Sequence, residues 1–406
     1  MVKVSQTPVV DLDAISDSLL VQWKDEFKNI RQDFHRHPEI GLVTPRTSAV
    51  IAEKLKEYGV DQIETGIGGH GVVAVIKGKY PSNISIGIRA DIDALPMEEL
   101  SQHDHTSVVP NCMHGCGHDG HATILLAVAK YLAHTREFPG QVVLIFQPGE
   151  EGWSGAKVMM DDGLFEKYPV SEVYAVHNSS AIEPGKFALN YGAMQAAADA
   201  FTITVTGSGG HASRPQLNHD PVLTAAHILV ALQSIVSRNV DPNETAVISC
   251  CSIHAGDPRA QSVCPEKCEI VGTVRTFSPE VQDLIEKRMN EVCTLVAQSM
   301  QCEAQLHYQR FYPPCINDAS LAKEVADIAS AMVGENNVDR NYPQMPGGED
   351  FAFMLQKYPG VYLRVGQGGA PAHNGLFDFN DEIIVPTATL LSRVVIHRLN
   401  TLNTSV

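Results

Sequence analysis

The sequence predicts an α/β protein in which one domain holds a largely parallel or mixed sheet flanked by helices, and a smaller ferredoxin-like α+β domain is inserted into it. Strands alternate with helices over the first 190 residues, which is typical of a parallel sheet. After Tyr191 the order changes to β-α-β-β-α-β, the ferredoxin-like split unit. The first pattern resumes after Pro313 and Pro314. We therefore expect domains at 1–192 with 311–406, and at 193–310.

The first domain opens with helices and continues with strands rich in β-branched residues. Apolar residues at helical spacing predict helices over Ser16–Phe34 and Thr47–Tyr58. The turn residues at 81–83 separate two predicted strands, Gly71–Ile76 and Ile84–Arg89. A third strand, at 141–146, is an uninterrupted apolar run, as expected of a strand buried on both faces. A helix at 155–162 and a strand at 172–176 follow.

The inserted domain and the return to the first domain show the same signals. Strands are expected at 201–206, 245–254, 269–277 and 302–310, with helices at 220–238 and 279–298, the second capped by Ser278. Beyond residue 314 we expect helices at 320–332, 351–356 and 386–400 and a strand at 361–365. A glycine-rich loop carrying His373 lies between that strand and the last helix.

Composition excludes several classes of function. The chain has 406 residues with Lys+Arg 30 against Asp+Glu 47, a net charge of -17, so a nucleic-acid-binding surface is not expected. No uninterrupted apolar run reaches the roughly 18 residues of a membrane span, and we identify no signal peptide. Nine cysteines without regular spacing fit reduced thiols. We therefore expect a cytoplasmic protein with neither a membrane nor a nucleic acid as partner.

The stretch Met113–His121, MHGCGHDGH, concentrates metal-binding side chains. It holds one thiol, three imidazoles and a carboxylate, and thiolate and imidazole are preferred ligands of zinc and its neighbours. The residues that follow have helical spacing and no glycine or proline. The ligands should therefore lie on a loop that opens a helix, although a glycine-rich turn with unrelated histidines is the plainer alternative.

Other candidate donors follow the predicted strands, where open α/β sheets place their sites. They are Asp91, Asp93, Glu150, Glu151, His177 and, in the late loop, His373. Two metal ions about 3.5–4 Å apart lower the pKa of a water between them, and the reaction also needs a carboxylate to accept its proton. Because adjacent residues in extended backbone point to opposite sides, one of the paired glutamates could coordinate metal while the other faces the substrate. Taken singly, His177 and His373 are better explained as core or loop histidines, and the paired glutamates equally well as a solvated acidic turn.

Several motifs occur in one order along nearly the whole chain: RADIDALP, MHGCGHDGH, FQPGEEGWSGAKVM, GSGGHAS, GTVRTFSPE, GGEDFAF and HNGLFDFND. Together they resemble the metallopeptidase family twenty amidohydrolases, in the branch of hippurate hydrolases, N-acyl-amino-acid amidohydrolases and auxin-conjugate hydrolases. The resemblance covers roughly residues 25 to 400. It implies that the inserted domain is a lid and dimerisation domain.

The resemblance also implies roles for the matching residues. Glu150 corresponds to the general base, and Asp93 to the carboxylate that orients a histidine ligand, a role for which Asp91 and Asp119 are further candidates. The metal ligands implied are Cys116, His118, Glu151, His177 and His373.

Two residues of the inserted domain also match. His211 corresponds to a histidine that reaches into the neighbouring subunit's site and stabilises the oxyanion, although residues alone favour a polar strand-end histidine. Arg275 corresponds to an arginine that could grip a substrate carboxylate, with an ordinary surface ion pair as the alternative.

The sequence departs from the family pattern at four places. Ser262 stands where relatives usually have asparagine, in a segment that is longer than theirs. The contact between the lid and the substrate is therefore not carried over from the family to this residue. Gly149 and Gly375 stand beside expected metal-site residues, where we expect looser loops. Gly348 replaces a usual serine.

We therefore expect a hydrolase with two divalent ions (manganese, zinc, cobalt or nickel) that cleaves the amide of N-acyl amino acids such as hippurate. Glu150 would act as base toward a hydroxide bridging the metals, and the protein would form a homodimer or larger homo-oligomer. One alternative is a deacylase of N-acetyl-diaminopimelate or other peptide-like conjugates. The other is a non-catalytic protein with one closed zinc site built from Cys112, His114, Cys116 and His118.

Overall fold

The computed structural model describes residues 11–404, which form two compact units. Of the described residues, unit 1 comprises 11–194, 316–343 and 353–404, and unit 2 comprises 195–315 with 344–352. From the sequence, 344–352 is expected in the first domain, whereas in the structure this segment belongs to the inserted unit. There, Ala196 N donates to the carbonyls of Met345 and Gly347, at 3.0 and 3.1 Å.

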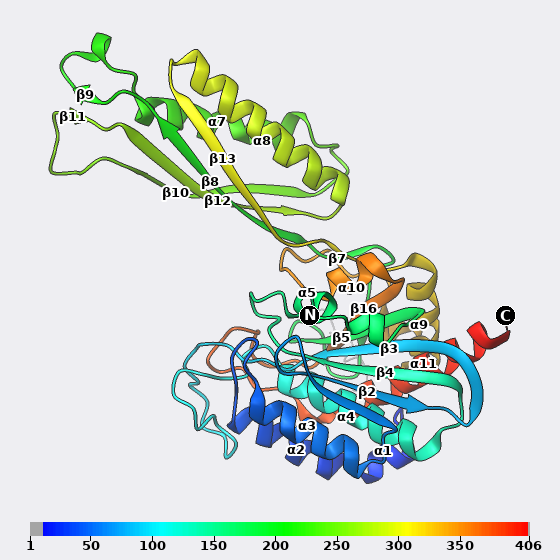
Figure 1. Ribbon diagram of the computed structural model, residues 1–406. Helices are drawn as coiled ribbons and strands as arrows, with labels where there is room; N and C mark the ends of the chain where they lie inside the picture. Colours follow the sequence, from blue (N-terminus) through cyan, green and yellow to red (C-terminus); the bar gives the residue numbers. More distant parts are fainter. Residues whose placement is uncertain (1–10, 405–406) are drawn as a thin grey trace, which may run out of the picture. The chain divides into compact units, whose positions relative to one another are not determined.

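Unit 1 is built on an eight-stranded mixed sheet with the order β1-β2-β4-β3-β5-β16-β6-β15 (Figure 1). Its central strands β4, β3, β5 and β16 are parallel, so their carboxyl ends lie at one edge. The strands are β1 (Gln62–Ile67), β2 (Gly71–Lys77), β3 (Tyr80–Asp91), β4 (Pro139–Gln147), β5 (Glu172–Ser179), β6 (Phe187–Ala188), β15 (Val338–Asp339) and β16 (Gly360–Gly366).

The helices of unit 1 pack around this sheet. Helix α4 contacts β3 and is itself contacted by α2, α3 and α11, while α9 packs on β16. The helices are α1 (Ser18–Gln22), α2 (Lys24–Arg36), α3 (Pro45–Glu57), α4 (His118–Thr135), α5 (Gly155–Asp161), α6 (Leu164–Lys167), α9 (Ala319–Val333), α10 (Ala352–Lys357) and α11 (Ile384–Thr404). Short 3₁₀ turns are η2 (Glu335–Asn337) and η3 (Asp381–Ile383).

Unit 2 has the predicted β-α-β-β-α-β order. Its antiparallel sheet runs β10-β12-β8-β13, and α7 and α8 pack on it (Figure 1). The elements are β8 (Ala197–Thr206), α7 (Pro221–Arg238), β10 (Ala246–Ala255), β12 (Lys267–Thr276), α8 (Pro279–Ser299) and β13 (Glu303–Tyr312). Smaller elements of unit 2 are β9 (Gly210–His211), η1 (Pro215–Leu217) and β11 (Val263–Cys264), whereas β7 (Ala193–Gln195) and β14 (Cys315–Ile316) have residues in both units.

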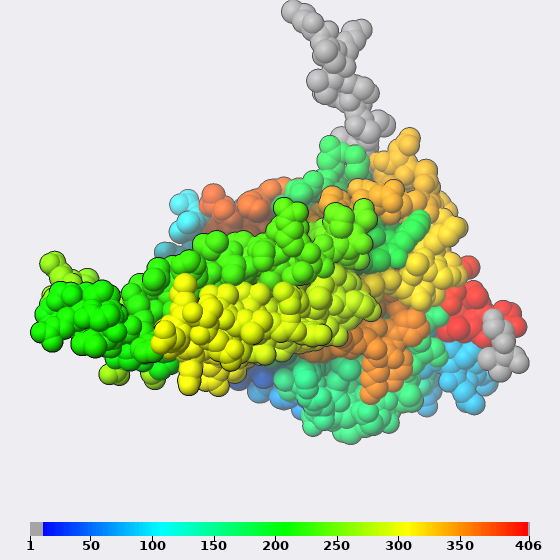
Figure 2. All heavy atoms as spheres, turned by 90° about the horizontal axis from the view of Figure 1, so that it is seen from above, coloured from blue at the N-terminus to red at the C-terminus, as the bar shows by residue number. Residues whose placement is uncertain are grey.

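Both long helices of unit 2 begin where the sequence predicts, because capping residues precede a proline. Asp220 accepts from the backbone N of Val222 at 2.8 Å, and Ser278 accepts from Val281 N at 3.3 Å. Figure 2 shows one face of this unit in green to yellow, the colours of α7 and α8. By length and composition alone α7 could cross a membrane, with a mean hydropathy of 1.3, a test that core helices of globular proteins also pass.

The expected α/β fold with an inserted ferredoxin-like unit is confirmed, with shifts at the ends of elements. The helix expected over 16–34 is divided into α1 and α2 at Trp23. Strand β1 was not expected, because half of its residues are exposed and its sequence lacks a clear apolar alternation. His177 lies within β5 rather than after it.

Candidate metal centre

The carboxyl ends of the parallel strands carry most of the predicted donors. Asp91 is the last residue of β3, and Asp93 follows it. Glu150 and Glu151 lie in the turn after β4, and His177 lies near the end of β5. Since these three strands are parallel neighbours, residues far apart in sequence meet at one edge of the sheet.

Helix α4 begins at this edge, with Cys116 two residues before its first residue, His118. Gly117 between them has φ 99°, a left-handed conformation that favours glycine. A Cβ atom at Gly117 would lie 2.5 Å from Oδ1 of Asn178. The backbone of the CGH motif therefore passes β5 too closely for a side chain at this position.

One group of donor atoms combines the start of α4 with β5. Donor atoms of Cys116, His118 and His177 all lie within 4.8 Å of one another. The Sγ atom of Cys116 is 3.4 Å from Nε2 of His177. The other ring nitrogen of His177 lies 2.8 Å from the carbonyl oxygen of Asn178, which fixes the orientation of the ring.

A second group shares the same thiol. Donor atoms of Cys116, Glu151 and His373 also lie within 4.8 Å of one another, with His373 Nε2 3.2 Å from Glu151 Oε1. The backbone N of His373 donates to Gly115 O at 2.7 Å, which ties the late loop to the CGH motif. Glu150 belongs to a further group with His118 and Glu151. The five predicted ligands thus converge on the thiol of Cys116, with Glu150 beside them.

Unsatisfied polar atoms in this cluster fit a bound cation. Both ring nitrogens of His118 are buried and lack a well-oriented hydrogen-bond partner within residues 11–404. Burial of such atoms costs free energy unless a partner compensates. Thiolate, imidazole and carboxylate together are a donor set for zinc, manganese, cobalt or nickel. The residues present therefore fit a divalent metal centre.

The charges of the cluster favour metal binding as well. Burial, together with the charge of Arg364, lowers the pKa of His177 well below its usual value, so its imidazole is neutral and can coordinate. Hydrogen bonds to Cys116 and Glu151 raise the pKa of His373 to about 10. A metal ion at this position must displace that proton, so metal affinity should fall as the pH falls.

Asp93 holds the turn that carries the paired glutamates. Its two carboxylate oxygens accept from the backbone N of Glu150 at 3.0 Å and of Glu151 at 3.2 Å. Its Oδ1 also lies 3.4 Å from Nδ1 of His118. Asp93 therefore links a histidine of one donor group to the turn that presents both glutamates.

A network of buried hydrogen bonds next to the centre was not predicted from the sequence. His121 lies one helical turn after His118, with Nδ1 2.6 Å from Asp91 Oδ1 and Nε2 2.7 Å from Asn178 Oδ1. Arg89 donates to Asp91 Oδ2 at 2.7 Å. The i, i+3 spacing of His118 and His121 on one helix face was the available signal.

Asp119 does not contact the ring of any of the predicted histidine ligands, although it was one of the candidates for orienting such a ligand. Its carboxylate instead lies 2.8 Å from Nδ1 of His35 and 3.6 Å from Nη1 of Arg31. Asp91, in contrast, lies 3.8 Å from Nε2 of His118. Of the two additional candidates for orienting a ligand, only Asp91 therefore faces the cluster.

The predicted site residues of unit 2 have defined local environments. His211 is exposed on β9, and its Nδ1 lies 3.0 Å from Ser213 Oγ. Arg275 on β12 donates to the backbone carbonyls of Val274 at 2.8 Å and Pro346 at 3.1 Å. Their roles in catalysis stay predictions.

The departures from the family pattern have structural explanations. The carbonyl of Ser262 accepts from Ala212 N at 2.9 Å, so the longer segment pairs with the strand that carries His211. Gly149 has φ 73°, and a Cβ atom there would lie 2.6 Å from Leu42. A Cβ atom at Gly375 would lie 2.8 Å from Leu100, and one at Gly348 would lie 2.8 Å from Tyr312. These glycines are closely packed in the structure, and the expectation that Gly149 and Gly375 loosen their loops stays a prediction.

The fold and the cluster define a metal-dependent hydrolase, and comparisons with known proteins identify its family. Residues 87–397 match the model of peptidase family M20/M25/M40, to which the chain belongs. It is 38% identical over 381 residues to the hippurate hydrolase of Campylobacter jejuni, covering 94% of this chain and 98% of the relative. It is 35% identical to IAA-amino acid hydrolase ILR1-like 4 of Arabidopsis thaliana, covering 90% of this chain and 84% of the relative.

A solved structure agrees with this assignment. The YXEP protein of Bacillus subtilis, a dinuclear metal binding peptidase from the M20 family, superposes with a TM-score of 0.83 at 28% identity, covering 94% of this chain and 99% of that one. The expected family and the assignment as a metal-dependent amidohydrolase are confirmed. The alternative of a non-catalytic zinc protein is wrong: Cys112 Sγ lies 3.5 Å from the carbonyl of Pro38, and Cys116 groups with His177 and His373 instead.

Proposed function

We propose that this protein hydrolyses the amide bond of N-acyl amino acids of the hippurate type, releasing a carboxylate and a free amino acid. The observation that carries the proposal is the convergence of Cys116, His118, Glu151, His177 and His373, with Glu150 beside them. The similarity to hippurate and auxin-conjugate hydrolases supports the substrate class.

The five converging residues would hold two divalent ions. Once bound, these ions supply a water of lowered pKa and polarise the amide carbonyl. Cys116 would contribute to holding both ions, because it belongs to both donor groups. The neutral imidazole of His177 can coordinate directly, whereas His373 must first lose its proton.

Glu150 acts as the general base. Its carboxylate takes one proton from the attacking water as the new carbon–oxygen bond forms, and it then delivers that proton to the amide nitrogen. The carbon–nitrogen bond breaks, leaving an amine and a carboxylic acid, which releases its proton to solvent and becomes the carboxylate. Asp93 acts as a positioning residue because it holds the backbone of the turn that carries Glu150.

The residues of the inserted unit supply substrate contacts in this proposal. Arg275 grips the carboxylate of the amino acid, and His211 stabilises the tetrahedral oxyanion in the site of a neighbouring subunit of a homodimer. The enzyme works in the cytoplasm, where its cysteines stay reduced.

The experiment is a substrate panel assayed with the metal-loaded enzyme. It contains benzoylglycine, other N-acyl amino acids, an indoleacetyl amino acid and N-acetyl-diaminopimelate. We expect the highest kcat/KM for an N-acyl α-amino acid and the loss of turnover in Glu150→Gln. A clear preference for N-acetyl-diaminopimelate would favour the alternative deacylase, and inactivity on the whole panel would contradict the proposal.

A further inference from the structure

A second cluster of metal-binding side chains lies outside the centre described above. Donor atoms of His103, His105 and Asp378 lie within 4.8 Å of one another. Nε2 of His105 is 3.1 Å from Oδ2 of Asp378, and Nε2 of His103 is 3.7 Å from the same oxygen. Two ligand atoms of a tetrahedral zinc, each about 2.0–2.1 Å from the metal, are about 3.3 Å apart. The spacing of this cluster therefore suits one cation.

The two histidines are oriented before any ion binds. A turn in which the carbonyl of His103 accepts from Thr106 N at 3.1 Å and Thr106 Oγ1 at 2.6 Å brings their rings together. The rings stack with an interplanar angle of 3° and centroids 5.1 Å apart. Both Nε2 atoms therefore point toward the same carboxylate.

The segment that carries Asp378 is held against the histidine segment. Leu100 N donates to Gly375 O at 2.7 Å, and Gly375 is packed against the Leu100 side chain. The side chain of His103 is 47% exposed, so an ion can reach the cluster from solvent. Binding would therefore need little rearrangement of the backbone.

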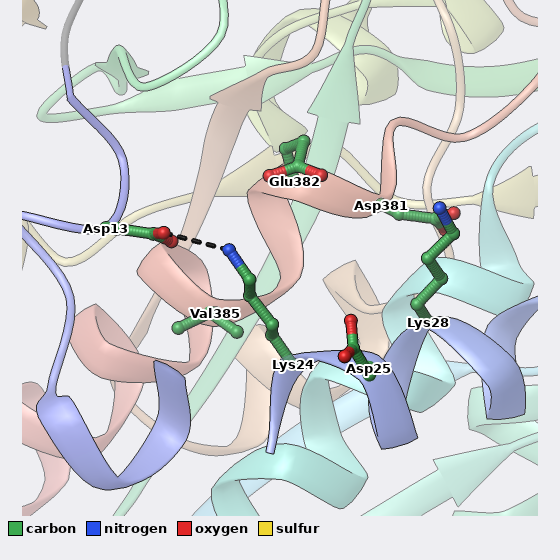
Figure 3. Close-up of a pocket in the computed structure, with 7 residues that line it drawn as sticks. All are labelled: Asp13, Lys24, Asp25, Lys28, Asp381, Glu382 and Val385. Atoms are coloured by element: carbon green, nitrogen blue, oxygen red, sulfur yellow. Dashed lines mark hydrogen bonds and ion pairs between the residues drawn. The ribbon is translucent and has the colours of Figure 1, made fainter. Parts of the chain in front are cut away.

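Arg31 is a cation close to this cluster, and it forms an ion pair with Asp378. It donates from Nη1 to Oδ1 of Asp378 at 2.8 Å, and its Nη2 lies 3.4 Å from Nε2 of His105. Arg31 also holds Asp381 through two hydrogen bonds of 2.6 and 3.0 Å. Asp381 lies at the edge of a polar depression beside Lys28 (Figure 3). Arg31 therefore keeps a bidentate partner, while Oδ2 of Asp378 faces the imidazoles.

The surrounding charge is negative enough to accept a divalent ion. Asp119 and Asp381 contact Arg31, and Glu99 contacts His35 at 3.3 Å. The acids in this region outnumber the cations, which offsets the repulsion between Arg31 and a bound metal.

We propose that His103, His105 and Asp378 form an additional site for one divalent transition-metal ion, separate from the hydrolytic centre. Two imidazoles and a carboxylate, completed by water, form a donor set suited to zinc, cobalt or nickel. The ion would join the 99–107 segment to the 373–378 segment that also carries His373. The ion would hold the loop that carries His373 and Asp378 against the 99–107 segment. This role does not depend on the substrate proposed above.

The test counts zinc. Full-length protein with its hydrolytic centre loaded is equilibrated with Zn²⁺, passed through a desalting column and analysed for bound zinc per chain. The wild-type chain should hold one zinc more than His103→Ala. The control variant is His397→Ala, which removes another exposed histidine, 3.5 Å from Glu324, and should keep the wild-type count.

The count is read as a difference, so it does not depend on whether the hydrolytic centre holds one ion or two. Equal zinc in the wild type and in His103→Ala would overturn the proposal. Titration with Zn²⁺ should also show that the additional site of His103→Ala binds zinc at least ~10–100-fold more weakly than that of the wild type, because loss of a ligand costs at least as much as loss of a residue that orients one.

A second measurement guards against a folding defect in the variant. Without added zinc, His103→Ala should unfold at the wild-type temperature, because the side chain is exposed. Added Zn²⁺ should raise the Tm of the wild type and of His397→Ala by a further increment that His103→Ala lacks. An equal rise in all three proteins would also overturn the proposal.

Discussion

The Sγ atom of Cys116 lies 3.4 Å from Nε2 of His177, although 61 positions separate the two residues in the chain. Cys116 also groups with Glu151 and His373, so a single thiol belongs to both sets of donors. This sharing gives the account its first prediction.

Cys116→Ala should lose more metal than a variant that lacks a ligand belonging to only one of the two donor groups. Elemental analysis is expected to show metal depleted from both positions in Cys116→Ala, and from one position in His373→Ala. The reason is that the thiol is common to both donor groups. Wild-type metal content in Cys116→Ala would show that the cluster is not the metal centre.

Asp93→Ala should impair catalysis through the turn that carries the glutamates. The substitution leaves the backbone N–H groups of Glu150 and Glu151 without their acceptor, at a cost of about 1–3 kcal/mol each if they stay buried. We expect kcat or metal affinity to fall by roughly 10–100-fold. Unchanged kcat, KM and metal content would contradict the positioning role.

Gly117→Ala should destabilise the protein and weaken metal binding. Its positive φ strains an alanine by about 1–2 kcal/mol, and the new Cβ atom also meets Asn178. The matched control is Gly59→Ala, which has φ 74° and open space, so it measures the backbone strain alone. Urea unfolding should show the larger loss for Gly117→Ala, and equal losses would mean that the close approach to β5 is unimportant.

Stability should depend on pH through His35, which is buried between Asp119 and Glu99. Burial alone would lower its pKa, but hydrogen bonds to both carboxylates raise it from 6.5 to about 9. A raised folded-state pKa contributes stability that is fully present below pH 6.5 and lost as the pH rises to about 9. The contribution is at most about 3 kcal/mol.

His35→Asn should remove this dependence. Urea unfolding at a series of pH values is expected to show the wild type losing stability between pH 6.5 and 9, with a flatter profile for the variant. A control at an exposed histidine, His227→Asn, should keep the wild-type slope. Parallel profiles for the wild type and His35→Asn would contradict the assignment.

Much of the fold and of the cluster could be predicted from the sequence, because the signals are local. Capping residues mark the helix starts, and uninterrupted apolar runs mark the buried strands. Strand β1 was not predicted because this edge strand, half of whose residues are exposed, has no apolar alternation in its sequence. Segment 344–352 was assigned to the wrong unit because its backbone pairs with residues near 196, a contact with no local sequence signal.

The candidate donors could be named from the motifs, but the hydrogen bonds of the buried residues around them could not be predicted. The contact between His121 and Asp91 joins α4 to β3, and the contact between His121 and Asn178 joins α4 to β5. Such contacts depend on how the helix packs on the sheet. For the same reason the sequence did not indicate that Asp119 faces Arg31 and His35, away from the cluster.

The central claim is that Glu150 transfers the proton while its neighbour Glu151 holds metal. The most direct measurement is kcat of Glu150→Gln on its best N-acyl amino acid, with metal content determined on the same sample and Glu151→Gln as the matched control. We predict that Glu150→Gln keeps its metal and loses turnover by roughly 10²–10⁴-fold, whereas Glu151→Gln loses metal. Near-wild-type turnover in Glu150→Gln with its metal retained would contradict the account.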